Sequence, residues 1–228
     1  MKITFLGTGA GSTAGSRRFK AGILVEGKEG KIVLDFGSGI NMRLEDMRVV
    51  PDAVFITHLH IDHFSGIFDH LVRRQIDRVP ELKVFSPPGF SEVLRVYQKT
   101  NNISAQVMED HLPSGKIGDL EVYSLEACHK IYAVSYIITD GKRRVLYSGD
   151  TLEPCDTVLR EISGVDLVIH EASCLENCKE WGHTSVKEAI NLFRNPVLTH
   201  VPAQLEGEVE NSVKGKALLA KDGLSLDV

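Results

Sequence analysis

The chain has 228 residues, of which 43% are hydrophobic and 25% are charged, and its formal net charge is −5. This length and composition exclude a disordered or fibrous protein and lead us to expect a single globular domain over residues 1–228. The acidic balance, with no long block of basic residues, argues against binding of nucleic acid through bulk electrostatics.

The N-terminal part of the chain alternates short apolar runs with turn residues. This pattern predicts strands over residues 2–6, 23–25 and 31–34, followed by a helix over 40–47. Gly9, Gly11 and Ala14 also fit the loose dinucleotide-binding pattern G-x-G-x-x-A, in which the glycine loop must open a helix. Here the loop leads into another predicted strand. The glycines are therefore expected to let backbone segments approach closely, and no dinucleotide site is predicted.

An apolar run over residues 53–56 predicts a buried strand, and candidate metal ligands follow it directly. His58, His60, Asp62 and His63 fall within six residues, and imidazole and carboxylate groups both bind ions such as zinc. In an extended turn the first two project to one side and the last two to another, so the loop could serve two ions. The alternative, a histidine-rich surface turn, is disfavoured because clustered histidines need partners.

Helices and strands alternate through the middle of the chain. Hydrophobic spacing predicts helices over residues 67–76 and 90–97 around a strand over 82–85, with His70 on the surface of the first helix. Further strands are expected over 120–125, 133–139, 143–147, 165–169 and 196–198, the last core strand, and helices over 157–162 and after the capping box of Ser185 and Glu188. This order favours a layered sandwich with helices outside.

Four more candidate ligands stand where predicted strands end: His129, Asp150, His170 and His200. Functional groups often occupy such loops because the strands behind them are rigid. One such residue would mean little, whereas several of them, together with the histidine-rich loop, indicate a site.

In their order along the chain, these residues resemble the metal motifs of the metallo-β-lactamase-fold hydrolases. The resemblance implies an α/β protein, a four-layer αββα sandwich, with two divalent metal ions, usually zinc, and with Mn²⁺ or Fe²⁺ as alternatives. In the family pattern, one ion would be bound by His58, His60 and His129, and the other by Asp62, His63 and His200, with Asp150 bridging. A water between the ions would lose a proton and attack as hydroxide, and Asp62 would accept that proton or orient the hydroxide.

Three further segments resemble the ribonuclease Z-like phosphodiesterase branch of this family: residues 5–9 (FLGTG), 170–173 (HEAS) and 182–185 (GHTS). This likeness implies hydrolysis of a phosphodiester in a nucleic acid or in a small cyclic substrate. His183 would contact the phosphate or donate a proton to the leaving oxygen, and Glu171 would orient it. His170 is either a site residue or a structural histidine.

The substrate stays open between the 3′ end of an RNA, such as a tRNA precursor, and a small cyclic phosphodiester. Ribonuclease Z enzymes usually carry a long basic arm that grips tRNA, often between the third and fourth metal motifs. Only twenty residues separate His129 from Asp150 here, and they predict a plain hairpin. Arg17, Arg18 and Lys20 would lie beside the metal loop and either contact phosphate or remain solvated.

Two other functions fit the same residues. A carboxylic ester, thioester or lactone hydrolase could share the fold, but His183 would have no obvious task in it. A regulatory domain that retains the fold would be expected to have lost metal ligands, and none is missing from the pattern.

Four cysteines, at positions 128, 155, 174 and 178, are too few for the framework of a small secreted domain, so reduced thiols are expected. Cys174, Cys178 and His183 lack the fourth ligand of a structural zinc site. The N-terminus lacks the apolar core of a signal peptide, and no apolar run approaches the ~18 residues that span a bilayer. A cytoplasmic protein, and from the family resemblance a homodimer, are the corresponding expectations.

Overall fold

Two stacked β-sheets form the centre of the protein in the computed structural model, which describes residues 1–11 and 17–228. The first sheet contains, in spatial order, β14 (Ser225–Asp227), β1 (Lys2–Gly7), β2 (Gly22–Glu26), β3 (Lys31–Leu34), β4 (Ala53–Phe55), β5 (Lys83–Ser86) and β6 (Gln106–Glu109). The second contains β13 (Leu218–Leu219), β12 (Val197–Thr199), β11 (Leu167–Glu171), β10 (Arg144–Tyr147), β9 (Val134–Thr139), β8 (Leu120–Glu126) and β7 (Gly115–Ile117).

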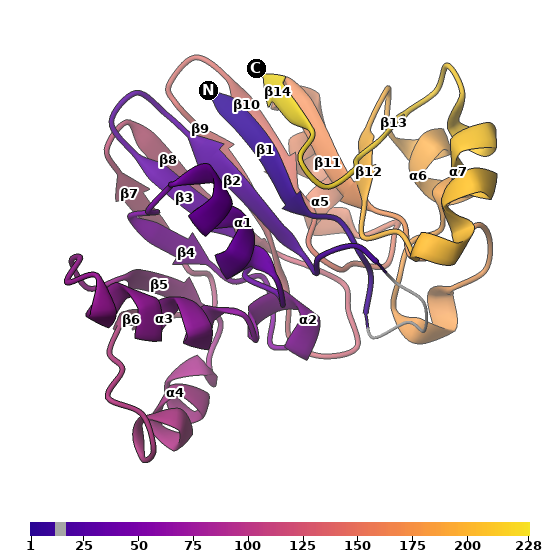
Figure 1. Ribbon diagram of the computed structural model, residues 1–228. Helices are drawn as coiled ribbons and strands as arrows, with labels where there is room; N and C mark the ends of the chain where they lie inside the picture. The colour runs from indigo at the N-terminus through magenta and orange to yellow at the C-terminus, as the bar shows by residue number, and fades with distance from the viewer. Residues whose placement is uncertain (12–16) are drawn as a thin grey trace.

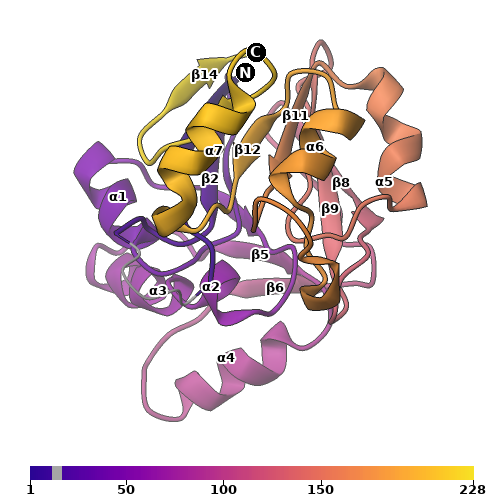
Figure 2. The same ribbon diagram turned by 90° about the vertical axis from the view of Figure 1, so that its right-hand side faces the viewer.

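Helices cover the outer face of each sheet (Figures 1 and 2). Those on the first sheet are α1 (Ile40–Met47), α3 (Ile67–Ile76) and α4 (Phe90–Gln98), and those on the second are α5 (Asp156–Glu161), α6 (Val186–Leu192) and α7 (Glu206–Val213). The remaining short helices are α2 (Ile61–Phe64), η1 (Ile162–Gly164), η2 (Lys179–Trp181) and η3 (Ala203–Leu205). The predicted four-layer αββα sandwich is confirmed.

Alternating side chains along the strands build this layering. In β2, Ile23 and Val25 enter the core between the two sheets, whereas Leu24 between them packs under the helices of the first sheet. The inner core is tightly filled, and the ring of Phe55 stacks on Phe85 at a centroid distance of 4.3 Å. Central strands are therefore buried on both faces, which explains why a segment such as β4 reads as a continuous apolar run.

Parallel pairing brings strand ends to one edge of the sandwich. Strands β3 to β6 run parallel in the first sheet, as do β10 to β13 in the second. The carboxyl ends of parallel strands meet at the same edge, which is where α/β proteins place their sites. Figure 1 shows α2, which follows β4, at this edge.

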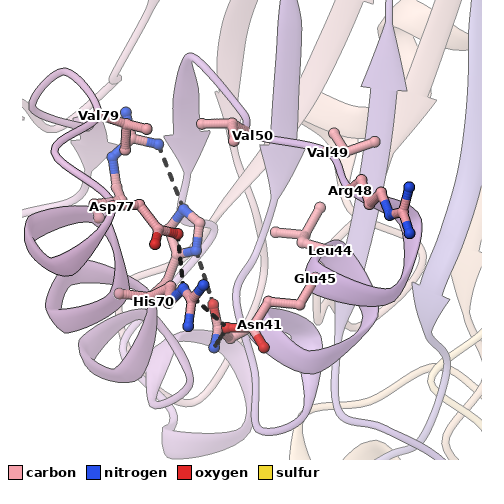
Figure 3. A pocket seen from close by; sticks show the side chains of 11 residues that line it. Asn41, Leu44, Glu45, Arg48, Val49, Val50, His70, Asp77 and Val79 are labelled. Atoms are coloured by element: carbon pink, nitrogen blue, oxygen red, sulfur yellow. Dashed lines mark hydrogen bonds and ion pairs between the residues drawn. The ribbon is translucent and has the colours of Figure 1, made fainter.

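His70 is not on the surface, contrary to the sequence-based expectation. It lies on the face of α3 that packs against α1 and is only 5% exposed. Its Nδ1 donates to Oδ1 of Asn41 at 2.9 Å (Figure 3). Its ring also packs against Phe36. A polar residue on this face can be buried because a residue of the neighbouring helix supplies its hydrogen-bond partner. Helical spacing alone does not reveal that partner.

The four cysteines form two disulfides, so the expectation of reduced thiols is wrong. Cys128 is linked to Cys155 across 27 residues, and Cys174 is linked to Cys178. Their Cα atoms are 5.8 and 6.1 Å apart, within the range that a disulfide spans. A count of cysteines does not show which of them the fold brings together.

None of the helices in the described part of the chain combines the length and the hydropathy needed to cross a bilayer. Of the three residues that fit the dinucleotide pattern, Ala14 lies outside the described residues. Gly9 donates its N–H to the carbonyl of Phe19 at 2.9 Å, so two backbone segments do approach closely at this loop.

Candidate metal centre

A buried carboxylate positions the loop that follows β4. Asp35 accepts hydrogen bonds from both the N–H and the hydroxyl of Thr57, with the N–H at 2.7 Å. Oδ2 of Asp35 also accepts the hydroxyl of Tyr147 at 2.7 Å. The imidazole Nδ1 of His63 lies 2.7 Å from the same Oδ2. Asp35 therefore ties the start and the end of the loop to the sheets. Sequence reasoning missed this residue, although it follows a predicted strand as Asp150 does.

A first group of candidate ligand atoms comes from the loop after β4, from the end of β8 and from the end of β10. Its members are His58, His60, His129 and Asp150, whose ligand atoms all lie within 4.8 Å of one another. Nε2 of His58 and Nδ1 of His60 are 3.0 Å apart, and Nε2 of His129 is 3.2 Å from the same Nδ1. The three ring nitrogens therefore lie close together and face one common point.

A second group consists of Asp62, His63 and His200. Nε2 of His200 lies 3.2 Å from Oδ2 of Asp62 and 3.2 Å from Nε2 of His63. We call these two groups together, seven residues in all, the ligand cluster. All seven residues that the family pattern assigned to the metal ions therefore gather at one sheet edge.

Asp150 stands between the two groups. Its Oδ2 is 3.6 Å from Nε2 of His58 in one group and 3.3 Å from Nε2 of His63 in the other. Its Oδ1 is buried and has no hydrogen-bond partner among the described residues. Burial by itself would raise the pKa of this carboxyl, but the imidazoles of His200 and His63 hold it well below the usual value. A buried, ionised and incompletely paired carboxylate is suited to a cation.

Hydrogen bonds on the far sides of the rings orient the histidines for metal binding. A carbonyl oxygen only accepts, so Nδ1 of His129 donates to Gly182 at 2.7 Å and its Nε2 carries the lone pair that faces the cluster. His63 is held in the same way because its Nδ1 faces the carboxylate of Asp35. Such partners fix the tautomer in known metal sites. The residues present thus fit divalent metal ions.

His183 and Glu171 form the pair that the resemblance implied. Nδ1 of His183 lies 2.9 Å from Oε1 of Glu171, which also accepts the N–H of Thr151, while Oε2 accepts the hydroxyl of Ser173 at 2.6 Å. Burial would lower the pKa of His183, but the hydrogen bond and charge of Glu171 outweigh it and raise the pKa to about 9. Glu171 therefore favours the protonated form of this imidazole.

His170 lies apart from these groups. Its Nδ1 donates to the carbonyl of Glu171 at 2.8 Å, its Nε2 is 3.4 Å from Oε1 of Glu153, and its ring packs against Phe193. The side chain is fully buried under the helices of the second sheet. Of the two roles left open by the sequence, the structure supports a structural histidine.

A cleft of about 590 Å³ opens over the ligand cluster. Its lining includes His60, Asp62, Asp150, His183 and His200, together with Ala10, Gly11, Trp181, Pro202 and Leu205. The N–H of Gly11 donates to Oδ2 of Asp62 at 2.8 Å, so the glycine loop does touch the metal loop.

The basic residues expected beside the metal loop do not line the cleft in the described part of the chain. Arg18 pairs with Glu206 at 2.8 Å, and Nζ of Lys20 donates to the carbonyl of Ala10 at 3.1 Å. Arg17 is exposed. Arg18 and Lys20 thus tie the N-terminal loop to the molecule, which is a structural role.

Comparisons with known proteins agree with this arrangement. The Beta-lactamase superfamily domain matches residues 38–196. The ribonuclease Z of Metallosphaera sedula is 25% identical over 263 residues, which cover 90% of this chain and 89% of that protein.

Two solved structures share the fold over the whole chain. The short form of human tRNase Z is 19% identical, covers 100% of this chain and 99% of its own, and has a TM-score of 0.79. A diphosphatase from the PhnP family is 17% identical, covers 100% of this chain and 97% of its own, and has a TM-score of 0.83. With the family match over most of its length, this chain belongs to the β-lactamase superfamily as a ribonuclease Z-like, metal-dependent hydrolase.

Proposed function

We propose that this protein is a phosphodiesterase that works with two divalent metal ions, most simply zinc. One ion would be held by His58, His60 and His129, and the other by Asp62, His63 and His200, with Asp150 shared. The observation that carries the proposal is the place of Asp150 between two groups of converging ligand atoms, with one carboxylate oxygen that accepts no hydrogen bond among the described residues and has only the ring of His200 near it, at 3.5 Å. When bound, such ions lower the pKa of water and neutralise charge on phosphoryl oxygens.

The chain's own residues would move the protons. The N–H of Gly11 holds Oδ2 of Asp62 in place, where its carboxylate would accept a proton from the attacking water. His183, protonated and held by Glu171, would give a proton to the leaving oxygen. A phosphodiester needs such a donor because its leaving alkoxide is a strong base.

We favour a small phosphodiester as the substrate, with an RNA 3′ end as the alternative. The relatives named ribonuclease Z and tRNase Z support a nucleic acid, whereas the structural likeness to a diphosphatase supports a smaller molecule. Two observations on this chain favour the smaller one. Strands β9 and β10 form a plain hairpin between His129 and Asp150, and the described lining of the cleft holds no lysine or arginine for a long phosphate backbone.

Turnover of bis-p-nitrophenyl phosphate by the metal-loaded protein tests the proposed activity, with p-nitrophenyl acetate as the matched ester. We expect hydrolysis of the phosphodiester and a loss of at least about 100-fold in kcat for Asp62→Ala, because proton transfer in the transition state contributes this much. Hydrolysis of the ester alone would instead support the carboxylic ester hydrolase, and turnover unaffected in Asp62→Ala would remove Asp62 from the mechanism.

A further inference from the structure

The single tryptophan of the chain, Trp181, lines the cleft above the ligand cluster. It ends the short helix η2, two residues before His183, and is 60% exposed. Two residues of chain span at most about 7 Å, so the indole is attached close to the proposed proton donor. Tryptophan is enriched at binding surfaces because its large ring offers apolar contact while its N–H can stay in water.

The segment that carries Trp181 is held firmly in place. Cys178 is fully buried, is linked to Cys174, and accepts the N–H of Trp181 on its carbonyl at 3.0 Å. The next residue, Gly182, accepts Nδ1–H of His129 on its carbonyl at 2.7 Å. The backbone on both sides of the indole is thus tied to the fold and to a candidate metal ligand. A preorganised aromatic surface loses little entropy when a ring stacks on it.

The rest of the cleft is short of positive charge. Apart from the histidines, its described lining combines acidic groups such as Asp62 and Glu176 with the apolar side chains of Pro202 and Leu205. A ligand here would be held by the metal ions at its phosphate and by apolar contact at its other end. A nucleobase can make this apolar contact because it has a flat π-face, whereas a sugar phosphate without a base has no such face.

We propose that Trp181 is a specificity-determining residue that stacks on the base of a nucleotide while the phosphodiester lies at the ligand cluster. The inference rests on the proposed phosphodiesterase function and narrows its substrate from any small phosphodiester to one that contains a nucleobase. It predicts that affinity depends on the base and that this dependence is lost with the indole ring.

Tryptophan fluorescence of the metal-loaded protein tests this directly, because Trp181 is the sole tryptophan in the sequence. AMP and ribose 5-phosphate serve as matched probes that differ only in the base, and neither contains a phosphodiester that the proposed activity would cleave. We expect AMP to quench and saturate the emission at lower concentration than ribose 5-phosphate does. Equal affinity for the two probes, or an emission that AMP leaves unchanged, would overturn the inference.

Calorimetric titration of two variants separates stacking from a structural role. Trp181→Ala should weaken the binding of AMP about tenfold, since base stacking on an aromatic side chain contributes free energy of this order, and should change the affinity for ribose 5-phosphate less than twofold. Trp181→Phe should recover most of the AMP affinity. Equal weakening of both probes in Trp181→Ala would show that the residue only maintains the cleft.

The outcome is separable from that of the proposed function. Cleavage of bis-p-nitrophenyl phosphate with no preference for AMP over ribose 5-phosphate would leave the phosphodiesterase standing and remove the nucleotide. A preference for AMP without cleavage of any phosphodiester would keep the base-stacking site and remove the activity. A change in oligomeric state, rather than in AMP affinity, on going to Trp181→Ala would assign the indole to an interface between copies of the chain and overturn the inference.

Discussion

At the scale of single residues, the site depends on groups that do not themselves belong to the ligand cluster. Asp35 accepts hydrogen bonds from Thr57 and Tyr147 and faces Nδ1 of His63. It was missed from the sequence because an aspartate after a strand has many structural uses and no motif marks this one. Its role became visible only once β10 brought Tyr147 against the loop after β4.

Asp35→Asn should weaken metal binding by about 10- to 100-fold. The amide NH₂ would face hydrogen-bond donors that the carboxylate now accepts, and the ring of His63 would be left poorly oriented. Competition with a chromophoric chelator measures this affinity. Asp52→Asn is the matched control, since Asp52 accepts the N–H of Lys31 at the other end of β4, far from the cluster. Equal metal affinity in the two variants would contradict the role given to Asp35.

His183→Ala should lower kcat by about 100-fold or more for a phosphodiester with an alkoxide leaving group, such as a cyclic nucleotide, because the residue is assigned to proton donation. The variant should affect bis-p-nitrophenyl phosphate much less, because p-nitrophenolate leaves without a proton, and its metal content should be unchanged. Elemental analysis alongside turnover checks both parts. Glu171→Gln should show a smaller loss of kcat, since the imidazole of His183 remains but its pKa is no longer raised by the carboxylate. His183 also belongs to a group of possible ligands with Asp150, Glu171 and His200, so a loss of metal in His183→Ala would reassign it as a ligand.

At the scale of secondary structure, the helices with strong sequence signals were predicted well. The structure confirms α1 over Ile40–Met47 and α3 over Ile67–Ile76, and the capping box of Ser185 and Glu188 does open α6. The misses have physical causes. The edge strand β6 has no fully buried side chain, so it lacks the apolar run that marks a strand. The contact between α1 and α3 buries His70, which spacing within one helix does not show.

This contact predicts a loss of stability in acid. Burial first, and then the charge of Arg74, lower the pKa of His70 from 6.5 to about 4, so the folded state favours the neutral ring. The corresponding stability is fully present above pH 6.5 and is lost as the pH falls towards 4. Denaturant unfolding at pH 7 and pH 4.5 should show that His70→Gln reduces this loss by about 2 kcal/mol. The same loss in variant and parent would refute the assignment.

At the scale of the whole molecule, the order of motifs was enough to predict the fold and the gathering of the seven metal ligands of the family pattern. That order constrains topology, because each ligand follows a strand whose neighbours are fixed by the sandwich. Contacts between residues that lie far apart in the sequence and belong to no motif could not be predicted. The disulfide of Cys128 with Cys155 is the clearest case. The single domain, the homodimer and the cytoplasmic location stay predictions.

The central claim is that the ligand cluster holds two metal ions that share Asp150. The metal-to-protein ratio after purification without chelator tests it most directly. We expect about two divalent ions per chain in the parent protein and about one or fewer in Asp150→Ala, since removal of the shared carboxylate weakens both positions. A ratio of zero or one in the folded parent protein would contradict the account.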